Sequence, residues 1–410
     1  MAAKREGSAS PLETREERRN RGCTSPANQR GSHSAKISRH EPEWGQPAFH
    51  ELGQQIFESF ARSDQRRHGM DYLEGLLRAH GRRSIRNIAA MFDDSAAPQR
   101  LHHFISNSTW EWSPVRRALG RYVVERMRPT VWVVRPKVIP KWGENAIGAD
   151  RQYAPQYGQV INAQQTVGIW AATESTSSPV NWRLQLSEAW LEQPTRRSQA
   201  AIPRDVTICD LTASVIDAAS ETGSHWGLPV MPVVMDARQV DVSLLVRGLR
   251  KAGLPFMVRV SKNLLLAETA QAPRRARADN VQAADQLMLG AWGRVRPVVW
   301  KSASAPRTEL TATAEVAVCR AAEQLVLLGI GRPRERWPGE LWLTDMTSVH
   351  VADLVRISRL PNRIDQDCSE GADRLGILDF GGRTYKGWHR HVTLVSAAHT
   401  VSVMRSCRER

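Results

Sequence analysis

The residues best suited to chemistry in this 410-residue chain are two aspartates far apart in the sequence. Asp236 ends the apolar run LPVMPVVMD, which predicts a buried strand, so its carboxylate is expected at the carboxyl end of that strand. Asp365, in the run RIDQD, is expected on a late helix. Carboxylate oxygens are ligands for hard divalent cations. Each aspartate also has an ordinary structural interpretation, as a strand-end cap at Asp236 and as a helix-surface acid at Asp365.

A basic and aromatic segment, RTYKGWHRH, follows the second aspartate. The histidine pair His389 and His391 could indicate a metal, but histidines beside a tryptophan on a basic segment more often pack in a core or face phosphates. No spacing of His, Cys and Asp supports nucleophilic catalysis. We expect the segment to contact DNA through Lys386, Trp388, His389 and Arg390.

The charge of the whole chain points to a polyanionic partner. Lys and Arg number 57 against 42 Asp and Glu, a formal net charge of +15 that is spread along the sequence, so nucleic acid fits best. A merely basic protein is the alternative. The five cysteines form no C-x-x-C pair, which argues against a zinc ribbon and a disulfide framework and fits a reducing cytoplasm. No apolar run reaches about 18 residues, so no membrane span is expected.

The first part of the chain divides into a tail and a helical segment. Residues 1–45 are rich in Arg, Glu, Ser, Gly and Asn, which predicts a disordered basic tail. Residues 46–128 carry apolar residues at steps of three and four, which predicts a helical DNA-binding domain. A helical bundle with a solvated basic face is the alternative. The arginines expected to contact phosphates are Arg82, Arg83, Arg86, Arg116 and Arg117.

From residue 131 the pattern becomes that of an α/β protein. Strands are predicted at 131–139, 158–170 and 179–186, and helix and strand then alternate. Residues 263–340 break this rhythm and are interpreted as a β-rich insertion. A helical pattern returns at 349–378. Three strands followed by alternating helix and strand predict a mixed α/β sheet.

Several stretches resemble, in order, motifs of insertion-sequence transposases of the DDE superfamily. RQYAPQYGQVINAQQTVGIW resembles the segment R-Q-Y-x-x-x-x-G-x-x-x-N-x-Q-x-G-V, and RTYKGWHRH resembles R-x-(W/Y)-(K/R)-G-W/F-H-x-H. VNWRLQLSEAWLEQPTRRSQAAIPRDV resembles W-R-L-x-L-P-x-x-W followed by arginine and G-I-P. The resemblance implies a ribonuclease-H-like core at 129–262 and 341–405, with the insertion placed before the last catalytic helix.

The resemblance also implies a chemistry. In this family three carboxylates hold two Mg²⁺ or Mn²⁺ ions about 3.5–4 Å apart, which activate the attacking oxygen and stabilise the leaving one. Asp236 corresponds to the second carboxylate, and Asp365 to the third, where the family has Glu. The first position falls on Arg135 in VWVVRPK, where the family has Asp. The family's flanking Arg and Lys are replaced by Pro361 and Ala372.

The implied function is that of a transposase-like protein that binds insertion-sequence ends. By descent it is a two-metal DNA strand transferase, and Arg135 predicts impaired catalysis because a cation opposes metal binding. A non-catalytic relic or a regulator of a transposable element is the alternative, and an active Mg²⁺-dependent transferase is the competing hypothesis. The expected cofactor is Mg²⁺ or Mn²⁺ if the chain is active and none otherwise.

The resemblance further implies a partner, a location and a geometry. The implied partner is double-stranded DNA at transposon ends, which a homodimer could bind. The implied location is the bacterial cytoplasm, in association with the nucleoid. Arg135 and Asp236 are expected on neighbouring parallel strands, with Asp365 facing them from a helix. The guanidinium of Arg135 should pair with one of the two aspartates.

Overall fold

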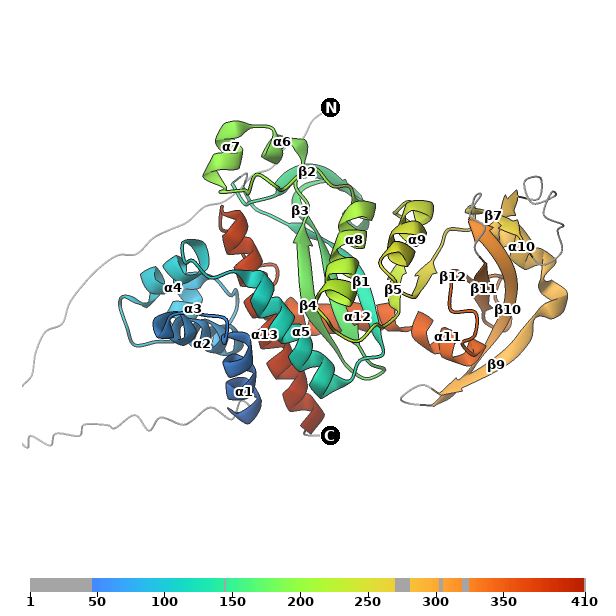
Figure 1. The fold of residues 1–410 in the computed structure, drawn as a ribbon, viewed down its shortest axis with the longest axis horizontal. Helices are drawn as coiled ribbons and strands as arrows, with labels where there is room; N and C mark the ends of the chain where they lie inside the picture. Colours follow the sequence, from blue (N-terminus) through green and yellow to red (C-terminus); the bar gives the residue numbers. More distant parts are fainter. Residues whose placement is uncertain (1–45, 144, 270–280, 302–304, 319–323, 409–410) are drawn as a thin grey trace, which may run out of the picture. The chain divides into compact units, whose positions relative to one another are not determined.

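The computed structural model is a mixed α/β fold (Figure 1). The tail predicted at 1–45 and residues 270–280 of the predicted insertion lie outside the described residues. None of the helices in the described part is long and apolar enough to cross a membrane. The structure describes residues 46–143, 145–269, 281–301, 305–318 and 324–408.

The first described elements are helices, which bury the apolar face that their residue spacing predicts. Leu73 and Leu76 of the second helix are fully buried, for example. The third begins at a side-chain cap, because the Ser84 hydroxyl accepts a hydrogen bond from the backbone N–H of Asn87. These helices are α1 (Gln46–Ile56), α2 (Ser63–Arg78), α3 (Ile85–Ala89), α4 (Ala97–Ser106) and α5 (Trp112–Met127).

The core sheet combines antiparallel and parallel pairing. β1 pairs antiparallel with β3 and parallel with β5, and β5 pairs parallel with β6. β4 pairs with β3, so the order of these strands is β4-β3-β1-β5-β6. This order confirms the predicted ribonuclease-H-like core. The strands are β1 (Val131–Pro140), β2 (Ala149–Ala154), β3 (Gln159–Ala172), β4 (Ser177–Leu184), β5 (Val233–Asp236) and β6 (Phe256–Arg259).

Two helices connect the parallel strands, and each starts at an aspartate. Asp210 accepts from the backbone N–H of Ala213 and Asp241 from that of Leu244. These caps satisfy backbone donors that a helix start leaves without partners. The short helices α6 (Glu188–Leu191) and α7 (Pro194–Gln199) precede α8 (Leu211–Ser220), and α9 (Val242–Lys251) follows β5.

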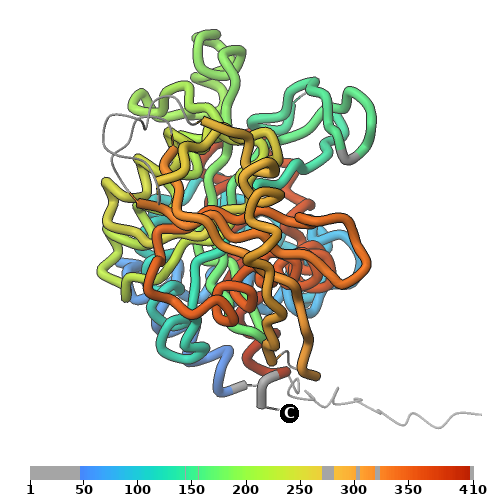
Figure 2. The backbone as a smooth tube through the Cα atoms, turned by 90° about the vertical axis from the view of Figure 1, so that its right-hand side faces the viewer, coloured from blue at the N-terminus to red at the C-terminus, as the bar shows by residue number. Residues whose placement is uncertain are grey.

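The strands of the insertion extend the core sheet. β12 pairs antiparallel with β6, with Trp342 opposite Arg259, and the order then runs β12-β11-β10-β7-β8. The described strands therefore form a single 12-stranded sheet, and Figure 2 views it from the insertion side. The elements are β7 (Leu265–Glu268), β8 (Val281–Ala283), α10 (Ala284–Gly290), β9 (Arg296–Lys301), β10 (Pro306–Val318), β11 (Leu325–Gly331) and β12 (Glu340–Thr344).

The helical pattern at 349–378 is not one helix. It divides into α11 (Val351–Ser358) and α12 (Leu360–Asp367), followed by a π-helical turn, Cys368–Ala372. Pro361 lies in the first turn of α12, and it has no N–H to continue the hydrogen bonds of α11. The last helix, α13 (Tyr385–Arg408), is 24 residues long.

Polar side chains of α13 are buried in the core. It packs against α2, α5 and β4. His391 Nε2 donates to the carbonyl of Gly376, and Nδ1 accepts from the Tyr72 hydroxyl, each at 2.8 Å. Burial lowers the pKa of His391 to about 4, so the ring is neutral. Arg390 donates to the carbonyls of Trp110 and Ile105, both at 3.0 Å.

Arg116 of α5 meets α13 in the same buried layer. Arg116 is 2% exposed, and its hydrogen-bond partners within the described part of the chain include no carboxylate. It donates to Thr393 Oγ1 (2.7 Å), the carbonyl of Trp182 (2.6 Å) and His389. Burial lowers the pKa of Arg116 to about 9, which still leaves it charged at neutral pH.

We predict that Arg116→Leu lowers the free energy of unfolding by about 2–4 kcal/mol, because it leaves several buried acceptors without a donor. Its neighbour Arg117 is exposed, and the carbonyl of Trp226 (3.0 Å) is its one hydrogen-bond acceptor among the residues that the structure describes. Arg117→Leu should therefore cost under about 1 kcal/mol. Urea unfolding followed by circular dichroism measures both values. Equal losses in the two variants would contradict this account of the core.

Candidate functional site

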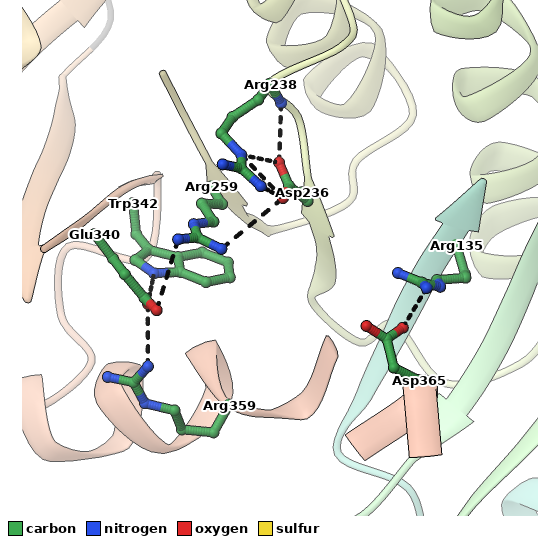
Figure 3. A network of polar contacts seen from close by, with 8 residues as sticks. All are labelled: Arg135, Asp236, Arg238, Arg259, Glu340, Trp342, Arg359 and Asp365. Carbon is green, nitrogen blue, oxygen red and sulfur yellow. Dashed lines mark hydrogen bonds and ion pairs between the residues drawn. The ribbon is translucent and has the colours of Figure 1, made fainter. Parts of the chain in front are cut away.

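β1, β5 and α12 bring the three positions that correspond to the family's carboxylates to one edge of the sheet. β1 and β5 pair in parallel through Trp132–Val233 and Val133–Val234. Arg135 lies two residues beyond Val133 on β1, and Asp236 lies two residues beyond Val234 on β5. Asp365 faces them from α12, as Figure 3 shows. The predicted placement on neighbouring parallel strands and a facing helix is therefore confirmed.

Arg135 forms an ion pair with Asp365. Nη2 lies 2.6 Å from Oδ1, and the side chains are 39% and 44% exposed (Figure 3). Burial raises the pKa of Asp365, and the positive charge and hydrogen bond of Arg135 offset only part of that rise. Of the two aspartates that were expected as partners for the guanidinium, Asp365 is the one that binds it.

Asp236 is held by a different arginine. Arg238 donates through Nε to Oδ1 (2.9 Å) and through Nη2 to Oδ2 (2.6 Å), and its backbone N–H also reaches Oδ1 (3.1 Å). Burial alone would raise the pKa of Asp236, but these hydrogen bonds and the charges of Arg238 and Arg259 lower it overall. Both carboxylate oxygens of Asp236 are therefore occupied by a guanidinium.

The ion pairs continue from the core strands into the insertion. Arg259 of β6 lies 4.0 Å from Asp236 and 3.7 Å from Glu340 of β12. Glu340 also accepts from the indole N–H of Trp342 and from Arg359, each at 3.1 Å (Figure 3). Alternating charges thus connect β5, β6 and β12 with the end of α11.

Lys137 stands two residues after Arg135 on the same face of β1. Its ammonium lies 2.8 Å from Asp373 Oδ1 and 3.1 Å from the sulfur of Cys368. Burial alone would lower the pKa of Lys137, but Cys368 and Asp373 raise it overall. Arg135, Lys137 and Asp373 line a cavity of about 450 Å³, which also includes Gln165.

Sequence reasoning missed Lys137, Asp373, Arg238 and Arg259. The available signal for Lys137 was its two-residue spacing from Arg135, which places both side chains on one face of a strand. Arg259 could have been found from its place at the end of the strand after Asp236. Nothing in the sequence pairs Asp373 with Lys137, because the contact depends on the π-helical turn after α12.

The residues expected to contact DNA fall into two groups. Arg82, Arg86 and Arg117 are exposed, whereas Arg83 and Lys386 are half-buried, and Lys386 pairs with Glu111 at 2.8 Å. The expectation is wrong for the other four, which are at most 2% exposed: Arg116, Trp388, His389 and Arg390. The last three belong to the buried part of α13, and Arg116 of α5 packs against that helix.

Comparison with known families agrees with this geometry. Residues 55–324 match the family model of DDE superfamily endonuclease. The chain belongs to this family of DDE-type transposases. No curated protein matches it. The match includes Arg135 and Asp236 and ends before Asp365.

Endonucleases of this superfamily generally use divalent metals, which would have to be held by the carboxylates at this site. Within the described residues, no group of three or more His, Cys, Asp or Glu side chains could hold a metal ion. Arg135 holds Oδ1 of Asp365, and Arg238 holds both oxygens of Asp236. In this arrangement the residues present do not fit a pair of divalent cations.

We predict that Arg238→Ala destabilises the chain by about 0.5–1 kcal/mol at about pH 7, since the pair with Asp236 is partly exposed. A lowered pKa means that the stabilisation is complete above the ordinary value of 3.8 and is lost as pH falls through the folded value. The difference in free energy of unfolding between Arg238→Ala and the parent should therefore be smaller at about pH 2.5 than at about pH 7.

Urea midpoints at both pH values measure this difference. Arg247→Ala, which removes an exposed arginine of α9, is the control and should change little at either pH. A difference for Arg238→Ala that is the same at both pH values would show that Asp236 is not its partner.

Proposed function

We propose that this chain is a transposase-like protein that binds double-stranded DNA at insertion-sequence ends without cleaving it by two-metal chemistry. The observation that carries the proposal is the 2.6 Å ion pair between Arg135 and Asp365. It stands where the family has a cluster of carboxylates. The chain would then act as a non-catalytic relic or as a regulator of a transposable element.

Electrostatics supports the loss of cleavage. Two unit charges about 4 Å apart interact by about 4 kcal/mol at an effective dielectric of 20. Replacing a carboxylate by Arg135 therefore turns an attraction for each cation into a repulsion of similar size. A metal would also have to displace the guanidiniums of Arg135 and Arg238 from the carboxylate oxygens.

Binding to duplex DNA is supported by the charge of +15 and by exposed arginines on the helices. Arg82 lies between α2 and α3, Arg86 in α3, and Arg117 on α5; all three side chains are exposed. Guanidiniums at such positions can reach phosphate oxygens, which fix a protein on DNA without reading its sequence.

The competing candidate is an active strand transferase. The retention of Asp236 and Asp365 on β5 and α12 favours it, because both carboxylates still face one edge of the sheet. It requires both guanidiniums to leave when metal and DNA bind. The shorter Asp365 and the absence of a basic residue at Ala372 weaken this candidate further.

We predict salt-dependent binding to duplex DNA, with log affinity falling by about 0.9 per phosphate contacted for each unit of log salt concentration. Arg86→Ala should make this slope shallower by about 0.9, and the control Arg247→Ala should leave it unchanged. Fluorescence anisotropy between about 50 and 200 mM salt measures the slopes. A flat response, or no binding at low salt, would remove the proposal.

We predict no nicking of the element's own DNA ends with Mg²⁺ or Mn²⁺. Arg135→Asp should restore at most partial activity, because Asp365 is one methylene shorter than the family's Glu. Gel assays of end-labelled duplexes measure both proteins, with Asp236→Ala as the control. Cleavage by the parent that disappears in Asp236→Ala would establish the active enzyme instead.

A further inference from the structure

Three reactive side chains meet between strand β1 and the turn that follows α12. Lys137 of β1 places its ammonium 3.1 Å from the sulfur of Cys368 and 2.8 Å from Oδ1 of Asp373. Oδ2 of Asp373 lies 3.0 Å from the same ammonium. An amine, a thiol and a carboxylate are thus held in contact with one another. The proposed function makes no use of the thiol.

The π-helical turn Cys368–Ala372 brings Cys368 and Asp373 to the same side of the chain. The carbonyl of Cys368 accepts a hydrogen bond from the backbone N–H of Asp373 at 2.9 Å, a bond that spans five residues. In an α-helix, residues five apart point about 140° away from each other. The wider π turn closes this angle, so both side chains reach Lys137.

The same turn packs against α13. A Cβ at Gly371 would lie 2.5 Å from Cε1 of His399, so glycine is the residue that allows this approach. Nε2 of His399 donates to the carbonyl of Ser177 at 3.0 Å, and the Ser177 hydroxyl donates to Asp367 at 2.6 Å. These contacts fix the end of α12 and, with it, the position of the Cys368 thiol.

The surroundings of the thiol decide how it can react. Cys368 is 4% exposed, but Lys137 and Asp373 line the cavity of about 450 Å³ beside Arg135. Hydrogen peroxide is little larger than water and can therefore reach the amine and the carboxylate beside the sulfur. Burial raises the pKa of the Cys368 thiol, and the charge of Lys137 offsets part of that rise. We therefore expect slow oxidation by a small oxidant.

Cys209 provides a contrast within the described part of the chain. It is half-buried, and its sulfur lies 4.0 Å from Oδ2 of Asp217. The groups that act on it among the described residues include no lysine. Oxidation of Cys209 would therefore leave the sulfur with no amine to react with.

We propose that Lys137 and Cys368 form a redox-sensitive cross-link, in which a peroxide converts the thiol into a sulfenic acid and the lysine nitrogen then bonds to the sulfur. A sulfenic acid condenses with a nitrogen to give a sulfenamide. The link ties the turn after α12 to β1. It requires neither DNA nor metal, so it stands apart from the proposed function.

The reaction balances in two steps. In the first, the Cys368 sulfur attacks one oxygen of hydrogen peroxide, the O–O bond breaks, and the products are the sulfenic acid and water. In the second, the Lys137 ammonium passes a proton to Asp373, and Nζ attacks the sulfur. The S–O bond breaks, and the leaving hydroxide takes the proton from Asp373 and departs as water. The new S–N bond keeps one hydrogen on nitrogen, and the remaining proton goes to solvent.

The link has consequences for charge and for stability. It removes the positive charge of Lys137, so Asp373 loses its ion pair at the edge of the sheet. The two linked positions are 231 residues apart in the sequence. A cross-link that closes so long a loop reduces the entropy of the unfolded chain. The linked protein should therefore unfold at a higher urea concentration.

The test is peptide mass spectrometry of the full chain before and after treatment with hydrogen peroxide. We expect a linked pair of peptides that carry Lys137 and Cys368, lighter than the two separate peptides by two hydrogen atoms. Dithiothreitol should reverse the link, because a thiol reduces the S–N bond, whereas a sulfinic acid would remain. A parallel sample with dimedone, which traps sulfenic acids, detects Cys368 that is oxidised but not linked.

Matched variants assign the link to this pair of residues. Lys137→Arg keeps a positive charge beside Asp373 and should abolish the link, as should Cys368→Ser. The controls Lys141→Arg and Cys209→Ser should leave it unchanged. Peroxide should raise the urea midpoint of the parent and of both controls, and it should not raise the midpoint of either site variant. The parent chain alone decides whether the link forms, so the test does not depend on the folding of a variant.

A reversible link between Lys137 and Cys368 that is lost in both site variants and kept in both controls supports the proposal. The proposal is overturned if Cys368 stays a thiol under peroxide, or if it becomes a sulfinic acid or a dimedone adduct with no link formed. A link that persists in Lys137→Arg would also overturn it.

Discussion

The parallel pairing of β1 with β5 determines which charged side chains meet at the carboxyl end of β5. It brings position 135 next to Asp236 and beneath α12, so the charge of that single residue sets the electrostatics of the whole edge. With Arg135 there, Asp365 is neutralised by an ion pair, and Asp236 turns to Arg238. Under the proposed function, the guanidiniums of Arg135 and Arg238 supply the positive charge that two cations would otherwise bring. The fold of the family is kept while the site becomes a set of ion pairs.

The alternation of charges extends through the sheet. Arg259 and Glu340 carry the alternation of charges from β5 to β12, the strand that joins the insertion to the core. Partly exposed ion pairs of this kind stabilise a fold only slightly. The stability of the chain comes instead from its apolar core and from buried hydrogen bonds such as those of Arg116 and Arg390, which hold α13 in place.

Sequence reasoning recovered the elements whose periodicity is strong, such as β1, and the relation between Arg135, Asp236 and Asp365. It failed where tertiary packing decides. RTYKGWHRH reads as a basic surface segment, yet Trp388, His389 and Arg390 are buried because backbone carbonyls and neutral side chains surround them. The division of α11 from α12 follows from Pro361, which was visible in the sequence.

The most direct test of the central claim is a crystal structure of the full chain grown with Mn²⁺, in which anomalous scattering locates the metal. We predict that the Arg135–Asp365 pair persists and that no anomalous peak lies between Asp236 and Asp365. A peak that bridges these two carboxylates, with the guanidiniums of Arg135 and Arg238 turned away, would contradict the account.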